Sequence, residues 1–504
     1  MFSASMKKRA HSAVAACLLW LAGCAHAPAG TNCTLPRSST WTEYLSKHFV
    51  FEVWRPERDP QKLVSSFEEL LGAVTGALVA EPIDLPRQVR VVVLPSRRDV
   101  EALAGQNVLG FYWVTRFGEP TILISSQDVE EVPQIVAHEL AHLVSYYLFP
   151  RQHRWFAEGL AQFVESVAKV DSRGQRWAGG DPQSGWGAGS IKLTPAPALF
   201  SWGETWLDCG LCDHDPYVTS WVLYRFLWSD HSKEFAEFER RLSQGDSPND
   251  AWGAAFPRWN RATGTLARLD GDLAYHQRHE RGMKFTVKVG EVDRTFTSAV
   301  ASSADLHMLL LPLKLERTNR LLKENVERDV AEEALREDPH NALATAALAR
   351  LQGAPLIPKL KEIVAARPTD RYAWYLLAEE NKDPAEREAA LKQAVAAWPD
   401  GALPNATLAS YLATTGRANE ALLFANHAVD LAPWNPDIIA SLALVAVELG
   451  KCPEALLLQS RAVDVATAKG IGAANSDDKA LRAKLEKYRT HCDTVRGAGG
   501  ASAR

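Results

Sequence analysis

Residues 138 to 142 spell the pattern in this chain with the clearest chemical meaning, His138-Glu139-Leu140-Ala141-His142. On a helix, side chains four positions apart lie on one face about one turn apart, so His138 and His142 could bind the same metal ion. Glu139 lies beside the first histidine, where it could reach a water on the metal and take its proton. The pattern therefore predicts a zinc site that activates water for hydrolysis.

The third ligand of such a site has to come from elsewhere in the chain. A catalytic zinc ion usually has three protein ligands and keeps a fourth position for water. Glu158 is the best candidate, in a second amphipathic segment from Trp155 to Val164 that begins shortly after Pro150. Two helices joined by a short turn can pack side by side and aim three side chains at one point. Gln162, one turn later, could hydrogen-bond a ligand, and a solvated or packing role is its alternative.

The elements around these residues must place them. Val129 to Leu148 is predicted to be a helix, because Pro133 suits a first turn, Glu130 and Glu131 suit the positive helix end, and an apolar stripe follows. Upstream, strand-like and helical patterns alternate. The predicted strands are Phe49–Trp54, Val89–Leu94, Gly110–Val114 and Thr121–Ser125, the last two forming a hairpin, and Lys62–Leu78 is predicted to be helical.

The order of these elements resembles the gluzincin metallopeptidases, in particular the peptidase-MA-like group, over roughly residues 40 to 240. The second ligand motif of that group is similar to W-x-x-E-G-x-A, which is represented here by Trp155, Glu158, Gly159 and Ala161. The resemblance implies a small twisted sheet packed on the zinc helix and a Zn2+ ion as cofactor. It also implies a peptide or protein substrate, with Glu139 as general base.

Two further roles follow from the resemblance alone. In gluzincins the strand just before the zinc helix is an edge strand that binds an extended peptide, so Thr121–Ser125 resembles a substrate shelf; an ordinary edge strand is the alternative. Gluzincins also use a Tyr or His after the third ligand to stabilise the oxyanion, and Tyr217 is the candidate here, with a helix-packing tyrosine as its alternative. The spacing of His153, His214 and His231 singles out none of them.

The N-terminus predicts export and lipid attachment. Residues 1–23 have a basic start and an apolar core too short to span a bilayer, as in a secretory signal. Leu21-Ala22-Gly23-Cys24 resembles the bacterial lipobox, which implies cleavage before Cys24 and a membrane anchor on its sulfur and amino group. The residue after Cys24 is Ala25 rather than the Asp that retains many lipoproteins in the inner membrane, so the resemblance favours the outer membrane, facing the periplasm. An ordinary signal peptide is the alternative.

Cysteine usage fits an oxidising compartment. Cys452 with Cys492 could link the C-terminal helices, and Cys209 with Cys212 could close a small loop or, less favourably, bind a metal. Cys33 is left over. A formal net charge of -5 and the lack of a long basic run exclude an electrostatic footprint for nucleic acid.

The last third of the chain repeats. Leu408, Ala409, Gly416, Ala421 and Ala428 match Leu442, Ala443, Gly450, Ala455 and Ala462 at a spacing of 34 residues. This is the tetratricopeptide period, in which small residues let antiparallel helices pack closely. We therefore expect a helical solenoid whose concave face could bind a protein partner, with a rigid spacer as the alternative.

The 504 residues exceed what one core supports, so several domains are expected. The predicted fold is an α+β zincin-like catalytic domain followed by an all-α tetratricopeptide-like solenoid. Its parts are a lipoprotein signal (1–23), a tether (24–40), the metallopeptidase domain (41–280), a hairpin and linker (281–317), the repeats (318–490) and a disordered tail (491–504). The predicted function is a zinc peptidase of the cell envelope. Alternatives are a catalytically silent scaffold that acts through its repeats and a hydrolase of non-peptide amides.

Overall fold

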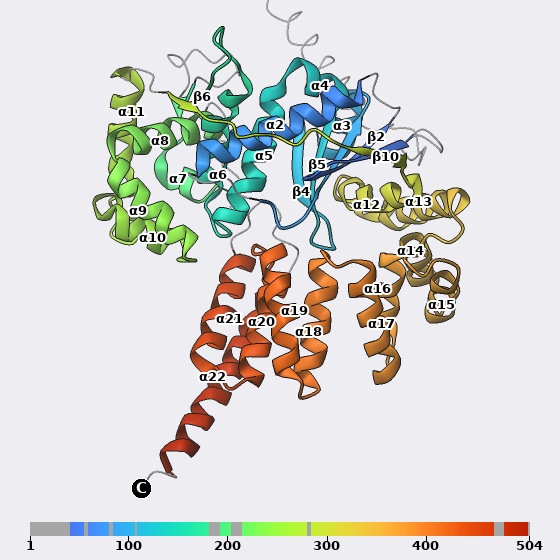
Figure 1. The fold of residues 1–504 in the computed structure, drawn as a ribbon. Helices are drawn as coiled ribbons and strands as arrows, with labels where there is room; N and C mark the ends of the chain where they lie inside the picture. Colours follow the sequence, from blue (N-terminus) through green and yellow to red (C-terminus); the bar gives the residue numbers. More distant parts are fainter. Residues whose placement is uncertain are drawn as a thin grey trace, which may run out of the picture.

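The computed structural model describes residues 41–54, 59–79, 84–105, 108–180, 192–202, 214–279, 284–467 and 478–501. In Figure 1 a sheet and its covering helices form one body, and a row of helices lies against it. The predictions for the signal segment, Cys24, the tether, Cys33, Cys209 and Cys212 lie outside the described residues. Within the described part, no helix combines the length and the apolar composition that a membrane crossing needs.

A six-stranded sheet forms the centre of the first body, in the order β10-β1-β2-β3-β5-β4. The strands are β1 (Trp41–Leu45), β2 (Phe49–Trp54), β3 (Val89–Leu94), β4 (Gly110–Val114), β5 (Pro120–Ser125) and β10 (Thr297–Val300). β2, β3 and β5 run parallel, whereas β4 pairs antiparallel with β5. Every residue of β3 is buried, because helices cover both faces of the sheet.

Alternating side chains divide the sheet residues between two cores. On one face, Val91 and Ile122 pack with α2 (Pro60–Leu78) and α5 (Pro133–Leu148). On the other face, Val92 and Leu123 pack with α3 (Arg97–Ala104) and α12 (Ser303–Glu316). The predicted strands and the first helix are therefore confirmed, and the sheet packs on the helix that carries the histidines.

The sheet order corrects one prediction. The hairpin is present, but its second strand, β5, lies between β3 and β4. Among the described residues, β5 is an interior strand, and the edges of the sheet are β10 and β4. The prediction that Thr121–Ser125 is an edge strand was therefore wrong, because the chain passes first along the edge as β4 and then returns to pair with β3.

The predicted helix over residues 129–148 is divided into two. α4 (Ser126–Glu131) ends before Val132, and α5 begins at Pro133. Proline disfavours helical backbone in the residue before it, so the break falls at Val132, whose φ is -136° and ψ is 63°. The prediction of a helix that carries both histidines is confirmed from Pro133 onward.

A group of helices and short strands follows α5. These elements are α6 (Arg154–Val164), the 3-10 turn η1 (Glu165–Ala168), β6 (Arg176–Ala178), β7 (Lys192–Leu193), α7 (Ala196–Phe200), β8 (His214–Asp215), α8 (Pro216–Asp230), α9 (Ser232–Ser243), α10 (Pro248–Ala255) and α11 (Leu269–His279). A dense aromatic core holds the helices together; Trp155 of α6 packs against Phe238 and Trp252, with ring centroids 6.1 and 5.7 Å apart.

Residues 284–296 do not form the expected hairpin. β9 (Phe285–Val287) pairs with β6, and the chain then crosses α2 to reach β10 at the sheet's other edge (Figure 1). The crossing chain can lie close to α2 because Gly76 has no side chain. A Cβ at that position would be only 2.5 Å from the carbonyl oxygen of Lys288. The segment expected to be a linker is thus packed on the sheet domain, and α12 follows it directly.

The C-terminal part is an array of antiparallel helix pairs. Its helices are α13 (Lys323–Glu337), α14 (Ala342–Gln352), α15 (Ile357–Ala366), α16 (Arg371–Glu380), α17 (Pro384–Ala397), α18 (Ala402–Thr414), α19 (Ala418–Leu431), α20 (Pro436–Glu448), α21 (Cys452–Thr467) and α22 (Asp478–Ala501). α18 and α20 begin 34 residues apart, at 402 and 436, and so do α19 and α21, at 418 and 452. The helical repeats read from the sequence are confirmed.

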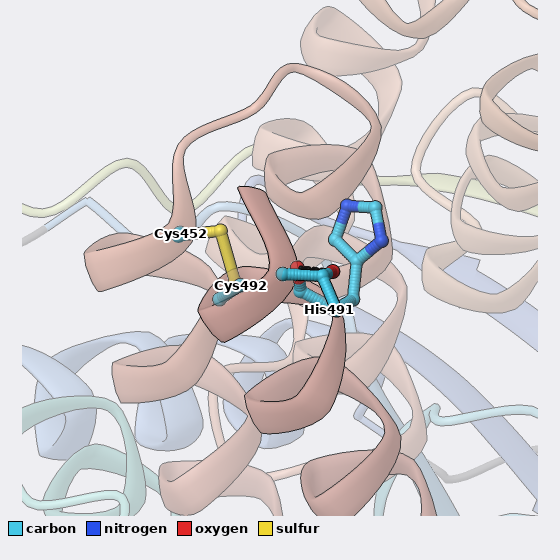
Figure 2. The surroundings of a disulfide bond; sticks show 4 residues. Cys452, His491 and Cys492 are labelled. Atoms are coloured by element: carbon cyan, nitrogen blue, oxygen red, sulfur yellow. Dashed lines mark hydrogen bonds between the residues drawn. A yellow bond between two sulfur atoms is a disulfide. The ribbon is translucent and has the colours of Figure 1, made fainter. Parts of the chain in front are cut away.

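The C-terminal end differs from the expected disordered tail. α22 continues to Ala501, and Leu481, Leu485 and Tyr488 bury its first turns against the last repeat. A disulfide joins Cys452, at the start of α21, to Cys492 in α22 (Figure 2). The apolar contacts and this covalent link anchor a helix that its polar composition alone did not predict.

Candidate metal centre

Three ligand atoms from two helices meet at one point. Nε2 of His138 lies 3.5 Å from Oε2 of Glu158, and Nε2 of His142 lies 3.4 Å from the same oxygen. In the described chain these three residues are the group of His, Cys, Asp and Glu side chains close enough to share an ion. The structure therefore brings together the three ligands predicted from the sequence.

The separations fit a metal better than direct hydrogen bonds. A hydrogen bond between charged groups would place nitrogen and oxygen about 2.8 Å apart. Two ligands bound to zinc at about 2.05 Å in tetrahedral geometry lie about 3.3 Å apart. The observed 3.4 and 3.5 Å match the second value, so the donor set fits zinc.

The helix geometry produces this arrangement. The His138 and His142 rings have centroids 4.8 Å apart and planes at 85°, so the two imidazoles stand nearly perpendicular on the same face of α5. α6 packs beside α5, and Glu158 on α6 is only 3% exposed. A buried carboxylate beside two imidazoles satisfies the ligand types zinc prefers.

Charge coupling within the group is strong. Burial alone would raise the pKa of Glu158, but His142 and His138 outweigh it and hold the pKa of this carboxyl well below its usual range. Burial would likewise lower the pKa of His138, yet the nearby carboxylates of Glu158 and Glu165 raise it well above its ordinary value. The charged forms of Glu158 and His138 therefore stabilise each other.

Glu139 lies next to the edge strand. A Cβ at Gly110, the first residue of β4, would be 3.2 Å from Oε1 of Glu139. Burial raises the pKa of Glu139, an effect that His138 and His142 partly offset. A raised pKa makes a carboxylate beside the three candidate ligands a stronger proton acceptor.

Glu165 is a site residue that the sequence reasoning missed. Its Oε2 lies 3.1 Å from Nδ1 of His138, on the nitrogen that does not face Glu158. It belongs to η1, just after α6 ends. A carboxylate in this position fixes the ring orientation and raises the basicity of a ligating histidine. The signal available in the sequence was Glu165 itself, seven residues after Glu158 and so two turns along the same helical path.

Gln162, considered for that supporting role, has a different contact. Its Nε2 donates to the carbonyl oxygen of Tyr217, 3.0 Å away. It therefore ties α6 to the start of α8. α8 can also approach α6 closely because Gly159 has no side chain. A Cβ there would lie only 2.5 Å from the carbonyl oxygen of Ser220. This close approach explains the glycine of the W-x-x-E-G-x-A pattern.

Tyr217 lies at the rim of the centre and is 44% exposed. Nη2 of Arg154 donates to its hydroxyl oxygen at 3.1 Å, and Trp202 stands edge-on to its ring at 4.9 Å. Burial, followed by the nearby charge of Glu158, raises the pKa of Tyr217. Nε of Arg154 in turn lies 3.6 Å from Oε1 of Glu158. Arg154, which the sequence did not single out, thus connects the phenol with the third ligand.

The remaining histidines named in the sequence lie elsewhere. His153 packs among Trp155 and Phe200, where burial lowers its pKa to about 4. His231 contacts Arg258. His214 belongs to the two-residue strand β8. Within the described residues, none of the three belongs to the group of side chains close enough to share an ion.

No family model matches the sequence, and no curated protein matches it. Similar solved structures are a thermophilic TPR protein of Thermus thermophilus (21% identity, TM-score 0.28, covering 37% of this chain and 100% of that chain) and a MamA protein (18%, 0.24, 33% and 94%). A second MamA structure is 20% identical with a TM-score of 0.24, covering 28% of this chain and 88% of that chain. The repeat architecture described above rests on the helix spacing itself.

Proposed function

We propose that this protein is a zinc-dependent metallopeptidase, with His138, His142 and Glu158 as ligands and Glu139 as general base. The carrying observation is the convergence of two imidazole nitrogens and one carboxylate oxygen at separations of 3.4 and 3.5 Å. Glu139 adjoins this point, on the side of the free sheet edge. Side chains that can hold a metal ion, a carboxylate base and a strand at the sheet edge together support metal-assisted hydrolysis of a peptide.

In the proposed reaction the metal ion and the residues around it have separate roles. Zinc, when held by the three ligands, would supply Lewis acidity that polarises a carbonyl group and makes water easier to deprotonate. Glu139 takes the proton of the attacking water and delivers it to the departing amine nitrogen. An extended substrate pairs its backbone with the free edge of β4, the strand that replaces β5 in this role. The Tyr217 phenol donates to the oxygen that becomes negatively charged.

The proposal includes the location. Lipidation at Cys24 would tether the enzyme to the bacterial envelope, on the periplasmic side of the outer membrane. The Cys452–Cys492 disulfide supports an oxidising compartment, since such bonds persist in the periplasm and are rare in the cytosol.

The second candidate is a catalytically silent envelope scaffold. The repeat array favours it, because stacked helix pairs present extended surfaces that commonly bind proteins. The complete set of three ligands and a base favours the peptidase over the scaffold.

The test compares the purified protein with Glu139→Gln and with Glu234→Gln, an exposed control on α9. Zinc content is measured first, and a library of bacterial tryptic peptides is then read by mass spectrometry for new termini. We expect one zinc per chain in all three proteins and a loss of about 10²–10⁴ in rate for Glu139→Gln only. Zinc without cleavage would favour the scaffold, and equal cleavage by Glu139→Gln would refute the assigned base.

A further inference from the structure

The tip of the β4–β5 hairpin is buried in the repeat array. The tip comprises residues 116–119, and Phe117 within it is only 3% exposed. The Phe117 ring lies 5.0 Å from Tyr372, 6.0 Å from Tyr375 and 6.0 Å from Trp398, measured between centroids. Figure 1 shows the end of the hairpin reaching the row of repeat helices. The array thus encloses an aromatic side chain of the sheet domain.

A buried charge fixes the same contact. Glu119, at the end of the tip, is 4% exposed. The Tyr372 hydroxyl donates to its Oε2 at 3.2 Å, and Nη2 of Arg371 lies 3.6 Å from its Oε1. From the sheet side, guanidinium nitrogens of Arg87 and Arg90 lie 3.7 and 3.6 Å from Oε1. Because a buried carboxylate needs its partners, separating the array from the hairpin would cost Glu119 the Tyr372 hydroxyl and the Arg371 guanidinium and leave it with Arg87 and Arg90 alone.

A second contact reaches the helix that carries the metal ligands. Trp434 of the array stands edge-on to Tyr147 near the end of α5, with centroids 4.7 Å apart. The Tyr147 hydroxyl donates to the carbonyl oxygen of Leu431 at 3.5 Å. On the sheet side, Tyr112 of β4 stacks on Tyr146 at 5.9 Å. α5, which carries Glu139, and β4, which lies beside it, are therefore both attached to the array, α5 through Tyr147 and β4 through the tip of its hairpin.

β4 connects the tip at one end with Glu139 at the other. β4 pairs with β5 along one side and is free along the other. Its first residue, Gly110, adjoins Glu139, and its last, Val114, is followed closely by the tip. The backbone N–H of Thr115 donates to the carbonyl of Glu119, so the strand continues directly into the buried turn. A shift of the tip would displace the strand from the carboxylate.

We propose that the repeat array is a positioning element of the active site, and that Phe117 is the positioning residue through which it holds β4 against Glu139. The inference rests on the proposed peptidase function for its effect on substrate. Its effect on the strand stands on the packing alone. Misplacement of a substrate by about 1 Å can cost about 10²-fold in rate, so a small displacement of β4 is measurable.

The experiment uses the full chain with Phe117→Ala, the conservative Phe117→Leu, and Tyr372→Phe, which removes the hydroxyl bonded to Glu119. Leu423→Ala is the control, because Leu423 is 73% exposed on α19 and remote from these contacts. Three quantities are measured: zinc content, hydrogen exchange of the β4 amides relative to β2 and β3, and kcat and KM for a cleaved peptide.

For Phe117→Ala we expect unchanged zinc, faster exchange in β4 but not in β2 or β3, and a rise in KM of about tenfold that exceeds the change in kcat. Phe117→Leu should restore most of the wild-type KM, and Tyr372→Phe should show a smaller change in the same direction.

Unchanged β4 exchange and unchanged KM in Phe117→Ala would overturn the proposal. If no peptide is cleaved by the wild type, the peptidase assignment fails, and the exchange of β4 still decides the positioning role. If Phe117→Ala does not fold, Phe117→Leu and Tyr372→Phe decide it by the same measurements, with wild-type exchange and KM in both as the refuting result.

Discussion

Oε2 of Glu165 lies 3.1 Å from Nδ1 of His138, whereas Nε2 of the same ring faces Glu158 at 3.5 Å. The imidazole of His138 thus lies between two carboxylates: Glu165, which contacts Nδ1, and Glu158, the proposed third metal ligand, which faces Nε2. A supporting carboxylate of this kind typically contributes a factor of about 10–100 to metal affinity.

Glu165→Gln is therefore expected to weaken zinc binding by about 10–100-fold without removing a ligand. Zinc affinity is measured by competition with a chromophoric chelator. Removing zinc with a strong chelator should abolish cleavage in the wild type, and added zinc should restore it. His279→Ala, which alters an exposed histidine on α11, serves as control and should retain wild-type affinity. Equal affinity of Glu165→Gln and wild type would show that Glu165 does not support the site.

Tyr217→Phe is expected to lower kcat by about 10²–10³-fold with little change in KM, as for removal of one oxyanion donor. The Tyr217 oxygen already accepts from Arg154, so its own hydrogen remains available to a substrate oxygen. Steady-state kinetics with one peptide measures both constants. Tyr275→Phe, at a tyrosine 63% exposed on α11, is the control. Wild-type kcat in Tyr217→Phe would support the helix-packing alternative.

The disulfide should stabilise the last repeat without affecting the metal centre. Cys452 and Cys492 are 40 residues apart, and a loop of this length corresponds to about 3–4 kcal/mol of stabilisation in the chain-entropy model. For Cys452→Ser/Cys492→Ser we expect faster hydrogen exchange and proteolysis in α22, with unchanged zinc content. Reductant should reproduce this in the wild type and have no further effect on the double variant. Equal protection of α22 in both proteins would contradict the expectation.

Glu239→Gln tests a half-buried carboxyl on α9, outside the candidate metal centre. Burial raises the pKa of Glu239 from 4.5 to about 7, and the hydroxyl of Tyr224 donates to it at 3.3 Å. Between pH 4.5 and about 7 the folded chain keeps a proton that the unfolded chain has released, so this group lowers stability as pH rises.

The variant should therefore be more stable than wild type by about 1–2 kcal/mol at pH 8, a value reduced for partial solvent screening, and equal to it below pH 4.5. Urea unfolding at both pH values measures the difference. Glu234→Gln, exposed on the same helix, should show no such pH dependence. A gain that is the same at both pH values would mean that Glu239 does not titrate as inferred.

The convergence of His138, His142 and Glu158 could be predicted because its geometry is local. The four-residue spacing of His138 and His142 follows from helical periodicity, and Glu158 needed only one further helix after a short turn. Arg154 was not predicted because it reaches the site through packing against Tyr217 of another helix, which no spacing rule marks. Glu165 has a suitable spacing from Glu158, but only the packing of η1 against α5 shows that it contacts His138.

The errors concerned relations between distant segments. Nothing in Gly110–Val114 or Thr121–Ser125 tells which strand of the hairpin pairs with β3, so the edge was misassigned. Residues 284–296 alternate like a hairpin, but β9 at their start pairs with β6, and β10, which follows them directly, pairs with β1 of the six-stranded sheet. The insertion of Phe117 between Tyr372 and Trp398 joins residues more than 250 positions apart, as the Tyr372–Glu119 bond with its separation of 253 shows.

The glycine at position 159 sets the spacing between α6 and α8. Its missing side chain lets the backbone of Ser220 approach to a distance that even a methyl group would block. Any larger residue would move the helix of Tyr217 outward, and the phenol with it, while the two histidines on the other helix stayed in place. Under the proposed function, such a substitution of Gly159 would leave metal binding intact and abolish peptide cleavage, although it removes no functional group.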